Sequence, residues 1–545
     1  MTISLPECCE TTPDLLDAAA STFGDKVFVD DNGLTYSFNT IRQQCRRVAA
    51  ALIASGFNAG DRAAIWAPNI HQWVTAALAI QYAGGVLVTI NTRYKGAEAA
   101  QILRSGQVST LFCIGHFLDQ DYPGLLAEQS LPDLHQTIVI GQSSVQTQTT
   151  WDDFCQQGED YLAQHGPELV DRRARAVQAN DISDLLFTSG TTGSPKGVMT
   201  AHGQNLATFR QWTEILGLNA DDRYLVINPF FHSFGYKAGI LACLMRGATL
   251  LPHQVFDADI ILARIQHEAI TVLPGPPTLF QSLLASPNRQ NFDLSSLAKA
   301  TTGAAVIPVE LISRMRGELG IATVISAYGL TESCGLVTMC HSEDSAKLIA
   351  TTSGQALPDT EVHCMDSAGK LLAAGETGEI VVRGFNVMRG YFNDPQATAD
   401  TIDADGWLHT GDIGVLDDNG YLTITDRLKD MFITGGFNCY PAEIENILGT
   451  HADVVMCAVI GIADERQGEV AMAWVVLTPG SSLTAEALIT WSRTHMANFK
   501  VPRNIRFVTE LPLNASGKVL KNELRIAAQT AASSAAKVPL NLRNV

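Results

Sequence analysis

Short runs of β-branched and aliphatic residues alternate with helical stretches through most of this chain. Four such runs are residues 225–228, 248–251, 271–273 and 323–325, and the turn sequence PGPP follows the third. Alternation of this kind favours layers of helices on largely parallel sheets, because two parallel strands need a crossover connection that is usually a helix. The sequence therefore predicts an α/β fold.

The pattern changes twice toward the C-terminus, which indicates more than one domain. Short strands and turns follow one another closely after residue 379, and an α+β pattern begins after residue 430. A chain of 545 residues is also too long for one core. We expect a large domain of layered α/β sheets with a β-barrel-like part, residues 1–428, and a small mobile α+β domain, residues 429–545. In the small domain we expect strands at 454–462, 470–478 and 505–508, a helix at 484–495, and a frayed tail at 526–545.

Net charge restricts the ligands that such a chain can bind. It carries 37 Lys and Arg against 56 Asp and Glu, a net charge of −19, so a broad basic surface for nucleic acid is not expected. Any polyphosphate must then be bound by local donors and a metal ion against an unfavourable overall field. We therefore expect small-molecule partners and no nucleic acid, and a homodimer is left open.

Cysteine use and the N-terminus indicate a cytoplasmic protein. The eleven cysteines form no C-x-x-C pair and no His/Cys cluster with zinc spacing, so reduced thiols are expected. The first residues, MTISLPECCE, lack the basic start and apolar stretch of a signal peptide. Gly84 and Gly85 divide the apolar segment 73–90, which favours a buried helix–turn–strand unit over a membrane span.

A loop of small polar residues follows the apolar run 185–187. It reads TSGTTGSPKG, residues 188–197, and can present backbone N–H groups, hydroxyls and one ammonium to an anion. A flexible linker is the alternative, but a linker needs neither the preceding strand nor the ending PKG. The loop is not a Walker A motif, since Pro195 precedes Lys196 and Gly197 follows it. We interpret it as a phosphate-binding loop.

Five motifs occur in the order found in one superfamily. They are TSGTTGSPKG at 188–197, YGLTE at 328–332, TGD at 410–412, DRLKD at 426–430 and NASGK at 514–518. Together they cover essentially the whole chain, which resembles the adenylate-forming superfamily of acyl-CoA synthetases, firefly luciferase and the adenylation domains of peptide synthetases. Because five ordered motifs are far more specific than one, we expect an acyl-CoA synthetase.

The resemblance implies a reaction in two steps. A carboxylate attacks the α-phosphate of ATP to give an acyl-adenylate and pyrophosphate, and CoA then takes the acyl group. Two anions meet in the first step, so charge must be neutralised by a metal ion and by placed lysine or hydroxyl donors. The expected cofactors are ATP, Mg²⁺ and coenzyme A. A thiol acceptor is favoured because the glycine turn at 434–438 resembles the one that lines the pantetheine tunnel of such enzymes.

Four residues are expected to act in catalysis. By resemblance, Thr331 donates to the α-phosphate and Glu332 supplies the hard oxygen ligand that Mg²⁺ requires. Lys518 bridges the carboxylate and the α-phosphate, which requires the small domain to close over the large one. His232 gates the acid site. Taken alone, Thr331 and Glu332 could form a helix cap, Lys518 an exposed turn and His232 a packed core histidine.

Other positions are expected to bind the nucleotide or CoA. Asp412 would accept both ribose hydroxyls, or be a turn aspartate beside Gly411. Arg427 would reach the ribose or the α-phosphate, and Lys429 occupies the hinge. Tyr328 would stack on adenine. The full set is Thr188, Ser189, Gly190, Thr191, Thr192, Gly193, Lys196, Gly303, Ala304, Ala305, Ser326, Ala327, Tyr328, Asp412, Arg427, Lys429, Gly435, Gly436 and Asn438.

The segment NPFFHSFGYKAGILACL, residues 228–244, resembles the gate and the first acyl-pocket helix of these enzymes. An unpaired buried ammonium costs several kcal/mol, so Lys237 should either reach solvent or meet a polar group on the acyl chain. With VLPGPPTLFQSLL and GGFNCYPAE, this segment resembles bacterial steroid-catabolism synthetases that activate an indanedione propanoate. We thus expect a bicyclic keto-acid. The alternatives are a medium- or long-chain fatty acid, a carrier-protein acceptor, or an inactive nucleotide-binding protein. Acid contacts are expected from Phe231, Tyr236, Lys237, Gly303 and Gly329.

Overall fold

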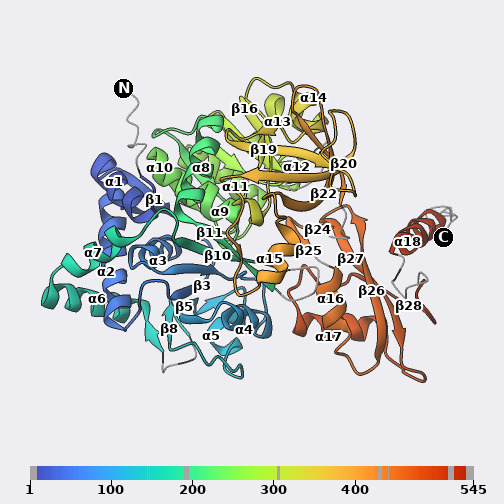
Figure 1. Ribbon diagram of the computed structural model, residues 1–545, viewed down its shortest axis with the longest axis horizontal. Helices are drawn as coiled ribbons and strands as arrows, with labels where there is room; N and C mark the ends of the chain where they lie inside the picture. Colours follow the sequence, from blue (N-terminus) through green and yellow to red (C-terminus); the bar gives the residue numbers. More distant parts are fainter. Residues whose placement is uncertain are drawn as a thin grey trace. The chain divides into compact units, whose positions relative to one another are not determined.

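The structure is a computed structural model that describes residues 9–143, 145, 148–189, 195–303, 307, 309–427, 432–439, 441–512, 519 and 521–535 (Figure 1). The chain divides into two compact units. One, here called the large unit, comprises Met1–Thr188 and Pro195–Leu428. The other, the small unit, comprises Ser189–Ser194 and Lys429–Val545.

One sheet of the large unit contains the strand runs that the sequence predicted. Its order is β18-β17-β16-β15-β14-β12-β13-β1-β2, and β1, β12, β13, β14, β15 and β16 pair in parallel. The α/β prediction is thereby confirmed. The strands are β1 (Val27–Asp31), β2 (Leu34–Ser37), β12 (Arg223–Val226), β13 (Thr249–Pro252), β14 (Val272–Pro274), β15 (Lys299–Gly303), β16 (Thr323–Tyr328), β17 (Thr338–Met339) and β18 (Gln355–Ala356).

A second sheet carries the loop motif at one end. Its order is β21-β11-β10-β4-β3-β5-β8-β9, and the strands from β10 to β9 pair in parallel. The motif of residues 188–197 joins the end of β10 to the start of β11. The strands are β3 (Arg62–Trp66), β4 (Val86–Thr89), β5 (Val108–Ile114), β8 (Gln136–Ile140), β9 (Thr149–Thr150), β10 (Ile182–Ser189), β11 (Pro195–Ala201) and β21 (Gly390–Tyr391).

Helices cover both faces of this second sheet (Figure 1). Alternate residues of a strand point to opposite faces. Ala63 and Ile65 of β3 belong to the same core as α2 and α3, whereas Ala64 and Trp66 pack with α4. The helices are α2 (Phe38–Ala54), α3 (His71–Tyr82) and α4 (Gly96–Ser105).

The apolar segment 73–90 forms the predicted helix–turn–strand unit. It comprises α3, a turn at Gly84 with φ +77°, and β4, all of whose residues are buried. Gly84 adopts the left-handed conformation that glycine tolerates without strain. Among the described residues, no helix combines the length and the apolar character that a membrane crossing needs.

The barrel-like part expected after residue 379 is an antiparallel sheet of the large unit. Its order is β19-β20-β22-β23, and β20, β22 and β23 follow one another as antiparallel neighbours. The strands are β19 (Thr360–Met365), β20 (Gly378–Gly384), β22 (Leu408–Leu416) and β23 (Leu422–Arg427).

The small unit has the α+β pattern that the sequence predicted, with one correction. Residues 526–535, expected to be frayed, belong to helix α18 (Lys521–Ala535). Alanine has the highest helix propensity, and the buried Leu524 packs with Ile460 and Trp474, which anchors the first turns. The other elements are β24 (Phe432–Thr434), β25 (Phe437–Cys439), α16 (Pro441–Leu448), β26 (Val454–Asp464), β27 (Gly468–Leu477), α17 (Ala485–His495) and β28 (Asn504–Phe507).

Candidate active site

Residues from three distant parts of the sequence meet around the carboxylate of Glu332. Thr188, at the end of β10, lies on one side, and its Oγ1 donates to Glu332 Oε1 at 3.3 Å. The Tyr391 hydroxyl donates to the same oxygen at 2.9 Å. Lys196, at the start of β11, has its Nζ 5.1 Å from the centre of the Tyr391 ring, within cation–π range. The structure thus brings together the two ends of the loop and the predicted metal ligand.

Sequence reasoning missed Tyr391. Its segment is fixed to both neighbours: Met388 N–H donates to the Glu332 carbonyl at 2.8 Å, and Phe392 N–H donates to the Gly197 carbonyl at 2.7 Å. The side chain is 8% exposed. The sequence shows only an aromatic residue after a glycine, so its position became apparent only when β21 was seen to pair with β11.

The carboxylate of Glu332 suits a hard cation that is bound mainly by substrate. The hydroxyls of Thr188 and Tyr391 both donate to the same oxygen, Oε1. Within the described parts of the chain, no three or more His, Cys, Asp or Glu side chains form a group that could hold a metal ion. Mg²⁺ commonly binds through one or two carboxylates, with phosphates and water as the remaining ligands. The donor set therefore fits Mg²⁺ bound with a nucleotide.

A second cluster joins three of the predicted nucleotide residues. Tyr328 ends β16, and its hydroxyl donates to Asp412 Oδ2 at 2.7 Å. Asp412 lies in β22 and is 7% exposed. In the antiparallel pair β22–β23, the backbone of Asp412 is in register with that of Arg427. The fold thus brings together positions 328, 412 and 427.

Close backbone packing explains two of the predicted glycines. Gly303 ends β15 opposite Ala327 of β16, at the carboxyl edge of the parallel strands. A Cβ at Gly303 would lie 2.6 Å from the Ala327 carbonyl oxygen, and a Cβ at Gly329 would lie 2.3 Å from the Gly335 carbonyl oxygen. Ser326, by contrast, donates its buried hydroxyl to the Ile349 carbonyl at 2.9 Å, so only its backbone could contact a nucleotide.

His232 is not the packed core histidine that its sequence context allowed. The residue is exposed to solvent, although the protein around it disfavours the charged form of its ring. This desolvation, together with the nearby Lys237, lowers the pKa of His232 to about 4. Nδ1 accepts a hydrogen bond from Phe234 N–H at 3.2 Å, so the neutral ring carries its proton on Nε2. His232 can therefore donate from Nε2 at neutral pH.

Two of the other predicted acid contacts are attached to neighbouring elements of the large unit. Tyr236 is fully buried, its hydroxyl accepts a hydrogen bond from Gln81 Nε2 at 2.8 Å, and its ring centre lies 5.8 Å from that of Trp73. The carbonyl of Phe231 accepts a hydrogen bond from Thr89 Oγ1 at 2.7 Å. These contacts attach the segment to α3 and β4.

Of the two sequence-based alternatives for Lys237, contact with solvent is wrong and contact with the acid stays a prediction. Its side chain is 0% exposed, so it does not reach solvent, and its Nζ lies 3.0 Å from Asp184 Oδ1. The ammonium therefore has a carboxylate partner inside the protein and needs no polar group on the acid. A charged residue within the apolar run ISDLLF was the signal that sequence analysis overlooked.

The predicted CoA glycines form a tight hairpin in the small unit. Gly435 and Gly436 have φ of +55° and +84° between β24 and β25, as a type I′ turn requires. A Cβ at Gly435 would meet nothing within 4 Å, so the turn conformation, rather than a close approach, explains this glycine.

Several predicted site residues fall where the structure gives no description. Gly190, Thr191, Thr192, Gly193, Ala304, Ala305, Lys429 and Lys518 lie outside the described residues, as do the side chains of Ser189, Arg427 and Asn438.

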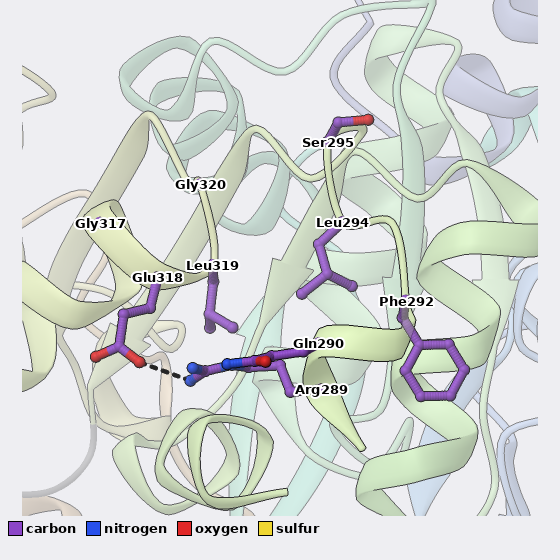
Figure 2. Close-up of a pocket in the computed structure, with 9 residues that line it drawn as sticks. All are labelled: Arg289, Gln290, Phe292, Leu294, Ser295, Gly317, Glu318, Leu319 and Gly320. Atoms are coloured by element: carbon purple, nitrogen blue, oxygen red, sulfur yellow. Dashed lines mark ion pairs between the residues drawn. The ribbon is translucent and has the colours of Figure 1, made fainter. Parts of the chain in front are cut away.

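A pocket of about 430 Å³ lies away from these residues (Figure 2). It is lined by residues between 289 and 295 and between 317 and 320, which precede β15 and β16. An ion pair of 2.7 Å joins Arg289 to Glu318 at its edge. The pocket therefore lies at the amino ends of β15 and β16. Gly303 and Tyr328 lie at the carboxyl ends of these strands, which form the opposite edge of the sheet.

Comparisons with known proteins agree with this arrangement. Residues 16–392 match the model of the AMP-binding enzyme family, and residues 443–518 match the AMP-binding enzyme C-terminal domain. A 7a-methyl-1,5-dioxo-octahydro-1H-inden-4-yl propanoyl:CoA ligase of Rhodococcus jostii is 49% identical, over 94% of this chain and 98% of the relative. A ligase of the same name from Mycobacterium tuberculosis is 48% identical over the same shares.

Solved structures show the same fold over nearly the full length. The amide bond synthetase of Marinactinospora thermotolerans has a TM-score of 0.81 at 27% identity, covering 95% of this chain and 99% of its own. The o-succinylbenzoate CoA synthetase of Bacillus subtilis has a TM-score of 0.77 at 28% identity, covering 94% and 98%. The chain belongs to the AMP-binding enzyme family.

Proposed function

We propose that the protein is an ATP-dependent acid–CoA ligase. In the first step a carboxylate oxygen bonds to the α-phosphorus of ATP, and the bond to the bridging oxygen breaks to release pyrophosphate. In the second, the sulfur of CoA bonds to the acyl carbon, AMP leaves, and the thiol proton passes to solvent. The observation that carries this proposal is the convergence of Thr188, Lys196 and Glu332. The two ends of a loop whose sequence suits anion binding lie beside one carboxylate.

Each side chain around the nucleotide has a proposed role. Glu332 would hold Mg²⁺, which when bound supplies neutralisation of the phosphate charge. Thr331 would donate to the α-phosphate, and Asp412 would accept the ribose hydroxyls while Tyr328 O–H holds one of its oxygens. His232 would donate from Nε2 at the acid side.

The small domain would complete the first step. We propose that residues 1–428 and 429–545 act as separate catalytic domains, that Lys429 is the hinge, and that Lys518 bridges the carboxylate and the α-phosphate. The turn of Gly435 and Gly436 would then contact the pantetheine arm of CoA in the second step. The described cysteines form no disulfide, which supports activity in the cytoplasm, and a homodimer stays a prediction.

The proposed acid is a bicyclic keto-acid of the indanedione propanoate type. The two relatives at 49% and 48% identity bear that substrate in their names, whereas the medium-chain acyl-CoA ligase of Danio rerio is 33% identical. Lys237 gives no support for a keto-acid over a fatty acid, because its ammonium pairs with Asp184.

The test is product release with a panel of acids, with and without CoA. We expect pyrophosphate and AMP, a CoA-dependent thioester, and a clear preference for the bicyclic keto-acid over octanoate and palmitate. A preference for fatty acids would reject the bicyclic keto-acid as the substrate. Release of ADP and inorganic phosphate would reject the ligase mechanism itself.

A further inference from the structure

A fully buried ion pair lies in the core of the large unit. Lys237 Nζ and Asp184 Oδ1 are 3.0 Å apart, and both side chains are 0% exposed. Thr200 Oγ1 accepts a hydrogen bond from Lys237 Nζ at 2.9 Å and donates one to Asp184 Oδ1 at 2.7 Å. Oδ2 of Asp184 accepts hydrogen bonds from Asn205 Nδ2 at 2.6 Å and from Ser183 Oγ. Protein donors therefore surround the carboxylate on both oxygens and fix the pair in one geometry.

Stability alone does not explain such a pair. Removing two charges from water costs about as much as their attraction returns, and an apolar pair of similar volume is often no less stable. Buried ionic groups are better explained where they fix one of several possible arrangements. The element that carries Lys237 offers such a choice.

Lys237 lies in a π-helical turn, η1 (Tyr236–Leu241), between α9 (Ser233–Gly235) and α10 (Ala242–Arg246). A π turn holds one residue more than an α turn, is rare, and often marks functional sites. Relaxation to α geometry would turn the residues beyond it by about 100°, the rotation of one residue in a helix of 3.6 residues per turn.

Two successive side chains attach this turn to different elements. The Tyr236 hydroxyl accepts from Gln81 of α3, and the Lys237 ammonium pairs with Asp184 of β10. If η1 changed from π to α geometry, at least one of these two contacts would be lost, because one side chain would move away from its partner. The ion pair therefore favours the π register.

The same turn adjoins the acid side of the proposed site. It follows closely after His232, which caps α9. On the other side, Asp184 precedes Thr188 by four residues in β10, and residues an even number apart share a face of a strand. The pair thus links the strand that carries Thr188 to the segment that carries His232.

We propose that Asp184 and Lys237 are positioning residues that set acid specificity by holding η1 in its π register. Neither side chain needs to touch the substrate. The inference rests on the proposed function, and it names determinants of that same site.

The test removes both charges at once. The double variant Asp184→Leu/Lys237→Met keeps similar volumes and leaves no unpaired charge. We expect it to fold and to raise the KM for the bicyclic keto-acid about tenfold or more, as loss of about 1.4 kcal/mol of binding would. The KM for ATP should stay within about twofold, because the contacts at Glu332 and Asp412 remain. If that variant fails to fold, Asp184→Asn/Lys237→Gln retains polar contacts and is measured in the same way.

A control comes from another ion pair of the large unit, in which Asp222 is buried and Lys299 is partly buried. Lys299 Nζ lies 2.6 Å from Asp222 at the amino end of β15, the edge away from the proposed site. Lys299→Met/Asp222→Asn should leave both KM values unchanged. A folded Asp184/Lys237 double variant with the wild-type KM and acid preference would overturn the inference, as would equal losses for every acid and for ATP. Failure of the proposed function would differ, because the wild-type enzyme itself would then release no AMP.

Discussion

Replacing Tyr391 by Phe removes one hydroxyl and leaves its ring in place. The hydroxyl donates to Glu332 Oε1 at 2.9 Å, whereas the ring lies beside Lys196 Nζ. A hydrogen bond to a charged group contributes about 1.5–3 kcal/mol, and Glu332 is only partly buried, so the lower end applies. Since 1.36 kcal/mol is a factor of ten, we expect Tyr391→Phe to slow acyl-adenylate formation about tenfold.

The assay is acid-dependent pyrophosphate release over a range of Mg²⁺ concentrations. The Glu332 carboxylate of Tyr391→Phe is less well oriented, so more Mg²⁺ should be needed for half-maximal rate. Tyr391→Leu serves as the comparison, because it also removes the ring beside Lys196 and should be slower still. An unchanged rate and an unchanged Mg²⁺ dependence in Tyr391→Phe would refute the role assigned to this hydroxyl.

Three further predictions concern other parts of the chain. Lys518→Ala should abolish acid-dependent pyrophosphate exchange while sparing CoA attack on supplied acyl-adenylate, and unchanged exchange would contradict its bridging role. Burial lowers the pKa of His202 from 6.5 to about 4, so the folded state binds this proton more weakly than the unfolded state. The free energy of unfolding should therefore be highest above about pH 6.5 and should fall by about 3 kcal/mol toward pH 4. His202→Asn, which offers an acceptor to Thr12, should flatten that dependence in thermal melts at pH 8, 6.5, 5 and 4. In chemical denaturation, Gly329→Ala should lower the free energy of unfolding by about 1–3 kcal/mol, since its Cβ would lie 2.3 Å from a carbonyl oxygen. Gly317→Ala in helix α13 (Val309–Glu318) should raise that free energy slightly, because a Cβ there meets nothing within 4 Å.

Elements with strong local signals were predictable from the sequence. The run 323–325 became β16, and the segment 73–90 became α3 and β4, because period, β-branching and glycine placement are local properties. The ordered motifs also identified Glu332 and Asp412, which the structure places beside Thr188 and Tyr328, respectively.

Long-range partners were not predictable in the same way. Tyr391 reaches Glu332 across 59 residues only because β21 pairs with β11, and no local pattern encodes that pairing. Asp184 and Lys237 are each a charged residue in an apolar segment. Only the fold shows that the two form an ion pair with each other. Helix α18 was missed for the opposite reason: its alanines carry propensity but little periodicity.

The place of β1 in the first sheet affects how the protein can be synthesised. Val29 of β1 pairs with Leu250 of β13, so this strand has no parallel neighbour until the ribosome has added more than two hundred further residues. Although β2 can pair with its other edge, the edge of β1 that faces β13 stays unpaired for roughly ten seconds or more at about 5–20 residues per second. Nascent chains arrested before residue 250 should therefore be protease-sensitive and should recruit chaperones, and a shortened N-terminus would weaken a sheet that is completed only late in translation.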